Sequence, residues 1–536
     1  MFIRLVIVVI ACHNHDDMFV RKKTVQGRTY VQVVENYWEG GKTHQRVIAT
    51  LGRLDKLTEE GAIDGILLSL ARLSDKVTVT SEYEKGNLSA GSVARIGPDL
   101  IAGRIWDELG LRGVIESLLS GRNHSFSVER AIYLSTLSRL FFPGSDRKAK
   151  RITRDYRVTG AEDIELHHLY RAMAWLGDNR EGIEQAVFES NRDLFTSLSV
   201  VFFDTTSIYF EGAGGQELGA RGYSKDRRPD ENQMVVGVVT DQEGRPISCP
   251  MWPGNTTDAK TIVPVASSLR ERFGVGDVVI VADRGMVGKK NMEALSSLGF
   301  TYILGVKMRL EKKAMREVLS RAGRFADVQP NLKVKEVTHE GKRYIVCLNP
   351  EEQRKDKLAR EAIVSQLRGK LKRGAGQLVG NTGYRRFLKV TKGSVTLDEA
   401  KIKADEKFDG KWVLITNTDL PAHEVATRYK ELWMVERVFR EAKDTLETRP
   451  VFHQKDSAIM GHVFVSFLSL LLVHELKKRI DFPAEWDEIR SDLDALYEVE
   501  VKSDGKTYLL RSKLQGICGK VFKAVGVAVP PSAAAA

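Results

Sequence analysis

The order of strand-like and helix-like segments after residue 198 most strongly constrains what this chain can fold into. Short apolar or alternating runs indicate strands, whereas apolar residues spaced three or four positions apart indicate helices. The predicted strands are 199–210, 233–240, 246–252, 277–283 and 301–306, and the predicted helices are 258–272 and 288–298. This order predicts an α/β fold in which antiparallel strands come first and helices then alternate with parallel strands.

The regions around this core have other patterns. Alternating residues at 30–38 and 44–52 predict a β-hairpin, and residues 56–74 predict a helix. The predicted parts of the chain are a β-hairpin region and linker at 18–95, a helical domain and candidate DNA-binding domain at 96–197, a mixed-sheet core at 198–309 and 411–475, an insertion domain at 310–410, and C-terminal helices with a disordered tail at 476–536.

Residues 1–17 are interpreted separately from the folded chain. Met1 to Cys12 is apolar and resembles a short export signal, but it contains a single Arg and is at the short limit for such a signal. Met18 offers a second start, followed by Phe-Val-Arg-Lys-Lys. We therefore interpret residues 1–17 as an upstream mis-start or a disordered leader, with an exported lipoprotein as the alternative.

The charge of the chain favours a polyanionic partner. Lys and Arg exceed Asp and Glu by 82 − 71 = 11 charges, and the isoelectric point is near 9.2. An excess of this size attracts nucleic acid and makes binding sensitive to salt. A solvated basic surface without a partner is the alternative, and the same two interpretations apply to the basic cluster at 147–154.

Cysteine and hydropathy patterns exclude other classes of protein. The four cysteines have neither the CxxC spacing of a zinc site nor a disulfide framework, and this fits a reducing compartment. No run reaches the roughly 18 to 20 apolar residues that a membrane span requires. The nearest candidate, Val463 to Val473, is short and interrupted by serines, so it predicts a buried core helix.

Two aspartates occupy unusual positions on the predicted strands. Asp283 ends a predicted parallel strand, at the edge where ligand sites gather in α/β sheets. Asp204 lies inside a strand, where aspartate is disfavoured by propensity. Because a buried carboxylate is costly without a partner or a cation, the pair predicts a metal site. The alternative for Asp283 is that it caps the following turn.

A third acidic residue lies on a predicted helix that runs to about Glu447. Tyr429, Glu436 and Lys443 are spaced by seven, and seven residues fall only about 20° short of two helical turns. We therefore expect these three side chains on one stripe, together with Arg440. Such a stripe suits a metal ion with DNA phosphates on either side, whereas a solvated face with ion pairs is the alternative.

These acids and their surroundings resemble those of DDE transposases of the IS4 superfamily, and within it the IS1634-like group of bacterial insertion-sequence transposases. The family's third-acid motif is Tyr, two residues, Arg, three residues, Glu, six residues and Lys. The positions that match are Tyr429, Glu436 and Lys443. Leu432 stands where the family has Arg, and Arg440 or Arg437 is the expected substitute.

Further blocks resemble the family in the expected order. They are the segments 203–207, 222–230, 253–258 and 282–286. The 153 positions from Asp283 to Glu436 leave room for the insertion domain that family members have there. The resemblance also implies the fold, which is an RNase H-like catalytic core: a mixed sheet with flanking helices, interrupted by the insertion and preceded by a small β element and a helical domain.

The resemblance implies a function and its residues. The chain is expected to be a transposase that cleaves DNA and transfers strands at the ends of an insertion sequence. Asp204, Asp283 and Glu436 would hold two Mg²⁺ ions, for which Mn²⁺ can substitute. The expected DNA contacts are Tyr429, Lys443, Arg440, Arg437, Lys225 and Arg284.

The expected partners are double-stranded DNA, as terminal inverted repeats and as target, and further copies of the chain in a synaptic complex. The expected location is the bacterial cytoplasm, in association with the nucleoid and away from membranes. Two alternatives remain open from the sequence: an RNase H-fold nuclease without strand transfer, and an inactive DNA-binding relic. Trp252 and Trp433 are candidates for stacking on an unstacked base, although the core is the expected place for both.

Overall fold

The computed structural model describes residues 18–39, 42–59, 62–71, 89–191, 198–309, 312–371, 386–391, 394–503 and 506–536. The expected leader at 1–17 and most of the expected linker lie outside these residues. The chain divides into two compact units. One consists of the described parts of Met1–Val93, Glu498–Lys513 and Pro530–Ala536, and the other consists of Ala94–Tyr497 and Leu514–Val529.

The N-terminal sheet confirms the expected hairpin and adds a strand to it. Its strands are β1 (Met18–Val25), β2 (Arg28–Glu39) and β3 (Lys42–Arg53). β2 pairs antiparallel with β3, as the alternating residues predict, and β1 pairs with the other edge of β2. Two short helices, α1 (Leu54–Glu59) and α2 (Ala62–Ala71), occupy the region where the sequence predicts one helix.

The end of the chain contradicts the expected disordered tail. A second sheet of the same unit has the order β19 (Ala533–Ala535), β18 (Lys506–Arg511), β17 (Tyr497–Ser503) and β4 (Ser89–Arg95). β19 pairs antiparallel with β18, with Ala534 opposite Leu509. An edge strand exposes unpaired backbone groups, and a run of small alanines can reach them without steric hindrance. The prediction missed this pairing because it depends on the partner strand.

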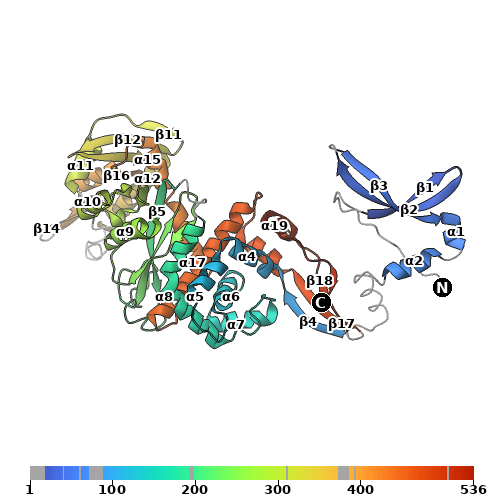
Figure 1. Ribbon diagram of the computed structural model, residues 1–536. Coiled ribbons are helices and arrows are strands. Elements are labelled where there is room, and N and C mark those ends of the chain that lie inside the picture. The colour runs from blue at the N-terminus through green and yellow to red at the C-terminus, as the bar shows by residue number, and fades with distance from the viewer. Residues whose placement is uncertain are drawn as a thin grey trace. The chain divides into compact units, whose positions relative to one another are not determined.

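The second unit contains the predicted helical block. Its helices are α4 (Gly97–Glu108), α5 (Leu111–Leu119), α6 (Val128–Phe141), α7 (Asp146–Asp155) and α8 (Leu166–Ser190), joined by α17 (Asp456–Arg479), α18 (Trp486–Asp494) and α19 (Cys518–Val525). α17 packs against α4, α6 and α8 (Figure 1). Among the described helices it alone is long and apolar enough for a membrane span, but most of it is buried inside the protein, which confirms the predicted core helix.

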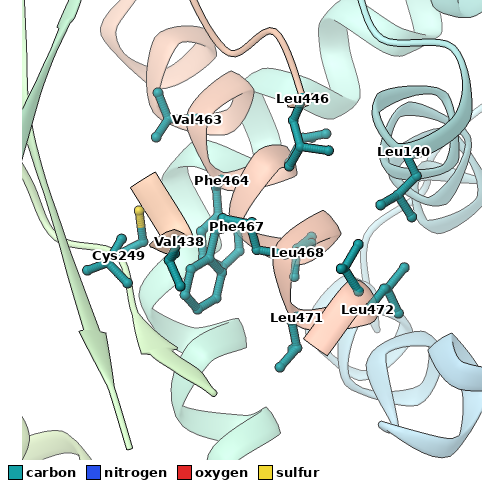
Figure 2. Close-up of a cluster of buried hydrophobic side chains, with 14 of the residues drawn as sticks. Leu140, Cys249, Val438, Leu446, Val463, Phe464, Phe467, Leu468, Leu471 and Leu472 are labelled. Carbon is teal, nitrogen blue, oxygen red and sulfur yellow. The ribbon is translucent and has the colours of Figure 1, made fainter. Parts of the chain in front are cut away.

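An apolar cluster joins this helical block to α16 (Trp433–Arg440), the helix that carries Glu436 (Figure 2). Phe464 and Phe467 of α17 belong to it, as does Val438 of α16. Burial of such side chains stabilises a fold by about 1.5–3 kcal/mol each. The helix with the third acidic residue is therefore held by the helical block as well as by the sheet.

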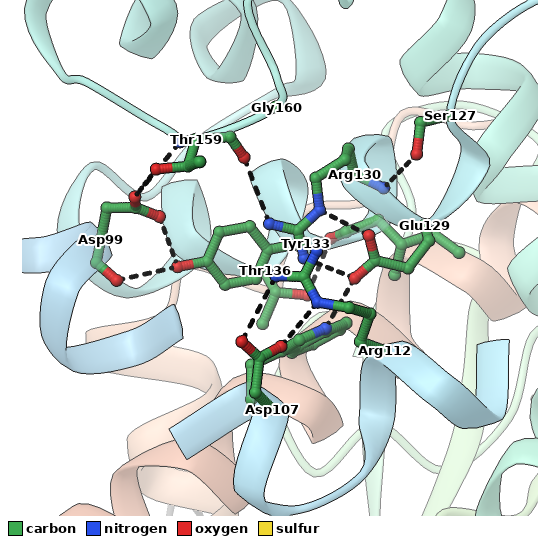
Figure 3. Close-up of polar contacts among 12 residues, drawn as sticks. Asp99, Asp107, Arg112, Ser127, Glu129, Arg130, Tyr133, Thr136, Thr159 and Gly160 are labelled. Atoms are coloured by element: carbon green, nitrogen blue, oxygen red, sulfur yellow. Dashed lines mark hydrogen bonds and ion pairs between the residues drawn. The ribbon is translucent and has the colours of Figure 1, made fainter. Parts of the chain in front are cut away.

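α6 is buried on every side, although it contains charged residues. Glu129 and Arg130 at its start pair with each other, and Glu129 also accepts a 2.8 Å hydrogen bond from Trp106 Nε1. Tyr133 donates a 2.8 Å hydrogen bond to Asp99 Oδ1 (Figure 3). Buried polar groups are tolerated when they are paired in this way, so the network lets α6 serve as the centre of the bundle.

The central sheet confirms the predicted strands. Its first strands are β5 (Val200–Tyr209), β6 (Gln233–Thr240), β7 (Pro246–Ser248), β8 (Met251–Pro253), β9 (Val279–Ala282) and β10 (Thr301–Gly305). β6 pairs antiparallel with β5, β7 and β8, whereas β5, β9 and β10 are parallel neighbours. The crossovers contain the predicted helices, α9 (Ile262–Phe273) and α10 (Lys289–Ser297). This is the strand order of an RNase H-like core.

The predicted insertion at 310–410 is divided between two structures. After α11 (Lys312–Ser320), the strands β11 (Ala326–Gln329), β12 (Leu332–His339) and β13 (Lys342–Leu348) continue the central sheet, because β13 pairs with β16 (Lys411–Thr416) and β16 pairs with β10. The remainder is α12 (Pro350–Leu371), β14 (Leu388–Thr391), β15 (Ser394–Leu397), α14 (Glu399–Asp405) and the 3₁₀ turn η4 (Glu406–Phe408). These last elements have a small core of their own around Phe387. The strands within the predicted insertion thus extend the central sheet, a pairing that the sequence pattern did not predict.

Candidate active site

The sheet brings Asp204 and Asp283 together. Phe203 of β5 is paired in parallel with Ala282 of β9, so the next residue on each strand is one of the two aspartates. Asp283 follows the last residue of β9 and begins the 3₁₀ turn η3 (Arg284–Met286). Its side chain makes no capping hydrogen bond there, so the alternative of a turn cap receives no support. Both aspartates lie where the strand pattern predicts them.

Asp204 is largely buried, with its side chain 18% exposed. Its Oδ1 accepts a 2.7 Å hydrogen bond from the backbone N–H of Thr205. The pKa of Asp204 is raised to about 6, chiefly by burial and also by the negative charges of Asp283 and Asp258, whereas Lys225 and the Thr205 N–H oppose the shift. A carboxyl with this environment needs a cation nearby to remain ionised.

Tyr429 ties the helical side of the site to Asp283. Its hydroxyl donates a 3.2 Å hydrogen bond to Asp283 Oδ1, and burial, followed by the charge of Asp283, raises the pKa of Tyr429. Gly305 at the end of β10 makes room for this hydroxyl, since a Cβ at that position would lie 2.3 Å from the Tyr429 oxygen. Glycine is required there by close approach.

The predicted single helix to Glu447 is wrong. The chain forms α15 (Ala422–Lys430), then α16, then the π-helical turn η5 (Glu441–Thr445). Between α15 and α16 the backbone bonds tighten to i→i−3, from Leu432 N to Tyr429 O (3.2 Å) and from Met434 N to Glu431 O (3.0 Å). A stripe with a period of seven assumes uniform helical geometry, and both the 3₁₀ turn and the π turn change the rotation per residue.

No hydrogen bond or ion pair joins the Glu436 side chain to the two aspartates among the described residues. It is exposed on α16, on a face shared with Trp433, Arg437 and Arg440. Within the described part of the chain, the Glu436 side chain has no hydrogen bond or ion pair, and no three His, Cys, Asp or Glu side chains are grouped to hold a metal ion. The structure therefore brings two of the three predicted acids together and leaves the third on a neighbouring helix that packs against β5.

Leu432 does not occupy a surface position. It is 6% exposed and belongs to the main apolar core, at the junction of α15 and α16. The family's Arg is thus replaced by a core residue. Of its expected substitutes, Arg440 is exposed, and Arg437 is exposed but pairs with Glu441 at 3.1 Å.

Lys443 is buried in an ion pair. Its Nζ lies 2.8 Å from Asp226 Oδ1, and the two side chains are 11% and 5% exposed. Arg449 also pairs with Asp226. Burial lowers the pKa of Lys443, and Asp226 opposes that shift. The cation expected to contact DNA is therefore neutralised inside the protein, by a residue that is 217 positions away in the sequence.

A carboxylate that the sequence interpretation passed over lies next to Asp204. Asp258 Oδ1 accepts a 2.7 Å hydrogen bond from Thr205 Oγ1, and a Cβ on Gly285 would lie 2.8 Å from Asp258 Oδ2. The carboxylate is thus situated between β5 and the turn that follows Asp283. The block 253–258 was a signal for it, but an aspartate before a helix also has the pattern of a cap.

A cleft of about 670 Å³ opens at this point. The charged residues that line it are Lys225, Asp258, Asp283, Arg284 and Lys307. Tyr223, which is 87% exposed, also lines the cleft. The expected DNA contacts Lys225 and Arg284 therefore both border a cleft that contains carboxylates, and Lys307 and Tyr223 are residues that the sequence interpretation did not select.

Trp252 and Trp433, the two candidates for stacking on a base, differ in burial. Trp252 packs edge-on against Phe203, with ring centroids 6.4 Å apart, in agreement with the expected core position. Trp433 is 53% exposed, so the expectation that it belongs to the core is wrong.

The described cysteines, Cys249, Cys347 and Cys518, are free and buried, and burial raises the pKa of Cys249 and of Cys347.

Two solved transposase structures are similar to parts of the chain. The piggyBac transposase synaptic complex with hairpin DNA, solved by cryo-EM, shares 9% identity over 74% of this chain and 76% of that chain, with a TM-score of 0.36. The Mos1 transposase paired-end complex with the left transposon end shares 12% identity over 35% and 64%, with a TM-score of 0.15. No curated protein matches the chain.

Family models give a direct assignment. The transposase DDE domain matches residues 196–472, more than half of the chain, and this range includes Asp204, Asp283 and Glu436. The IS1634 family transposase N-terminal domain matches residues 19–82. These matches favour a transposase over a nuclease that does not join strands and over an inactive relic. The chain belongs to the transposase DDE domain family, with an N-terminal domain of the IS1634 family, and is an enzyme that cleaves and transfers DNA strands with divalent metal ions.

Proposed function

We propose that Asp204, Asp283 and Glu436 hold two Mg²⁺ ions at which the transposase cuts and joins the ends of an insertion sequence. The observation that carries this proposal is the position of Asp204 and Asp283 side by side on parallel strands, inside the family's matched range. Carboxylate oxygens are the ligands that hard divalent cations prefer. Two neighbouring, partly buried carboxylates repel one another, and a shared cation removes that repulsion.

The ligand atoms that the site offers are of the type that such ions prefer. Asp204, Asp283 and the nearby Asp258 supply oxygen atoms only, without the sulfur and imidazole ligands that zinc prefers. Mn²⁺ is expected to substitute because it accepts the same ligands. When bound, divalent cations activate the attacking water or 3′-hydroxyl and stabilise the leaving oxygen.

Glu436 would complete the site from α16. α16 packs against β5, the strand that carries Asp204, and α15 immediately before it is attached to Asp283 through Tyr429. The exposed Glu436 carboxylate has no partner to give up within the described residues.

The residues around the carboxylates would position DNA. The Tyr429 hydroxyl orients the Asp283 carboxylate, while Arg284 and Lys307 supply positive charge along the cleft. The exposed Arg440 and Arg437 would contact phosphates beside Glu436. Such contacts fix the register of the DNA and carry no sequence information.

A second basic surface supports a DNA-binding role for the helical domain. Arg147, Arg151 and Arg154 are exposed on α7 at spacings of four and three, so they form one stripe, while Ala149 and Ile152 face the core. We propose that this stripe holds the backbone of the terminal inverted repeats. Cleavage of two ends and joining to a target would then require further copies of the chain in a synaptic complex, in the cytoplasm next to the nucleoid.

The test is Asp204→Ala in the full-length protein. Imperfect inverted repeats that flank the reading frame would supply the DNA substrate, and cleavage and strand transfer would be measured with and without Mg²⁺. We expect Asp204→Ala to abolish both reactions, whereas Asp277→Ala, which removes an exposed carboxylate of the same domain, leaves them unchanged. Unchanged Mg²⁺-dependent cleavage by Asp204→Ala would reject the proposed site.

A further inference from the structure

The ammonium group of Lys225 lies among the carboxylates of the site. Its Nζ is 3.5 Å from Asp258 Oδ2 and 4.0 Å from Asp204 Oδ1. It also donates hydrogen bonds to Thr205, at 2.6 Å to the backbone oxygen and 2.9 Å to Oγ1. A side chain expected to reach out to DNA therefore points back to the strand of the first acidic residue.

The backbone of the loop fixes this arrangement. The Lys225 N–H donates a 2.8 Å hydrogen bond to Ser207 Oγ on β5. A Cβ on Gly222 would lie 1.9 Å from the carbonyl oxygen of Gly254, so the loop lies directly on the segment that leads to Asp258. Its next residue, Asp226, is held in the buried pair with Lys443. The loop is thus anchored on both sides of the lysine.

The charges at this point explain why a lysine is needed. Asp204 and Asp258 are held close together by Thr205, which donates its backbone N–H to one and its hydroxyl to the other. Like charges at such short range repel unless a cation compensates them. Lys225 forms an ion pair with each carboxylate, at 3.5 Å to Asp258 and 4.0 Å to Asp204.

We propose that Lys225 is an internal counter-ion, which neutralises the Asp204–Asp258 pair before a divalent cation binds and must withdraw when one does. The inference rests on the proposed metal site and adds a residue that sets the affinity of that site. Lys225 is then a positioning residue, because it acts through the carboxylates. An ammonium group and a divalent cation at the same carboxylates repel each other, so Lys225 should weaken metal binding and stabilise the metal-free protein.

The experiment compares Lys225→Met with Lys307→Met in the full-length protein. Lys307 lines the same cleft but forms no ion pair with Asp204 or Asp258 among the described residues, so its replacement removes the same charge without uncovering the carboxylate pair. The thermal midpoint is measured in EDTA and then during a Mg²⁺ titration. Lys225→Met should lower the midpoint in EDTA and reduce the half-saturating Mg²⁺ concentration about threefold to tenfold, whereas Lys307→Met changes that concentration less than about twofold, because exposed charges are screened.

Two further variants keep the inference testable if Lys225→Met folds poorly. Lys225→Arg retains the positive charge and should keep both values near those of the wild type. Lys225→Met combined with Asp258→Asn removes the carboxylate that was left uncompensated, so its stability in EDTA should recover relative to Lys225→Met. An EDTA midpoint no higher in the double variant than in Lys225→Met would overturn the proposal.

The Mg²⁺ titration separates this inference from the proposed function. A wild-type protein that shows no saturable response to Mg²⁺ would reject the metal site itself, and the counter-ion with it. A saturable wild type whose half-saturating concentration is matched by Lys225→Met would reject only the counter-ion. A lower half-saturating concentration for Lys225→Met, with Lys307→Met close to the wild type, would support it.

Discussion

The aspartates and the glutamate helix are positioned in different ways. Asp204 and Asp283 follow paired residues on hydrogen-bonded parallel strands, where a register error of one residue would turn each side chain to the opposite face. Glu436 lies on α16, between a tightened turn and a π-helical turn. A sheet therefore positions its side chains firmly, whereas the direction of a helical side chain depends on every residue that precedes it.

The largest effects in this comparison should come from the acidic residues on its two sides, Glu436 and Asp283. Glu436→Ala is expected to lower the rate of strand cleavage by roughly a hundredfold or more, because several kcal/mol of charge stabilisation are lost at about 1.4 kcal/mol per factor of ten. Asp283→Ala should have an effect of the same size, and Glu424→Ala on the preceding helix should have little. Near-normal cleavage by Glu436→Ala would show that the two sides of the comparison do not form one site.

The junction of α15 and α16 can be tested at Leu432. Leu432→Arg restores the family's residue but puts a charge at a core position, so it should destabilise the protein by several kcal/mol and should not raise activity. Leu358→Arg, at an exposed position of α12, is the matched control. Chemical denaturation measures both. A stable, more active Leu432→Arg protein would show that Arg can reach the DNA from this junction.

On the strand side of the site, Asp204 should make the stability of the metal-free protein depend on pH. Burial raises the pKa of Asp204 to about 6, well above the ordinary range of an aspartate, so the contribution of this group to stability is complete below about pH 4 and is lost as the pH rises through about 6. The Asp204→Asn variant has no ionisable group at this position, so its stability should not fall in this way as the pH rises. Between pH 4 and 7, the free energy of unfolding of Asp204→Asn should therefore increase relative to the wild type by on the order of 3 kcal/mol. Denaturation in EDTA, with Asp277→Asn as control, measures this, and parallel curves would contradict the burial of Asp204.

The smallest effect concerns the contact that links the two sides. Gly305→Ala should push the Tyr429 hydroxyl away from Asp283 and destabilise the protein by about 1–3 kcal/mol, because an added methyl group overpacks the site. Tyr429→Phe removes the oxygen that would clash. The double variant should therefore lose less than the sum of the single variants in thermal denaturation. Strict additivity would mean that the Gly305–Tyr429 contact is unimportant.

The sequence was most informative where short-range pattern and backbone pairing agree. Apolar runs that end in or contain an aspartate were enough to predict β5, with Asp204 inside it, and β9, which Asp283 follows directly. The strand β13 was not recognised as part of the sheet, because its pairing with β16 joins residues far apart in the chain. The tail strand β19 was missed for the same reason, since its pairing depends on an edge that the sequence does not display.

By itself, the sequence determined the transposase family and the strand order, and it predicted which acidic residues form the site, because these depend on residue types and spacings. Only the tertiary structure decided which charges are free to meet DNA or metal. Lys443 forms an ion pair with Asp226, and Lys225 forms ion pairs with Asp204 and Asp258, whereas Glu436 is exposed. The physical reason is that the electrostatic role of a charge is set by burial and by partners across the fold, and the linear sequence specifies neither directly.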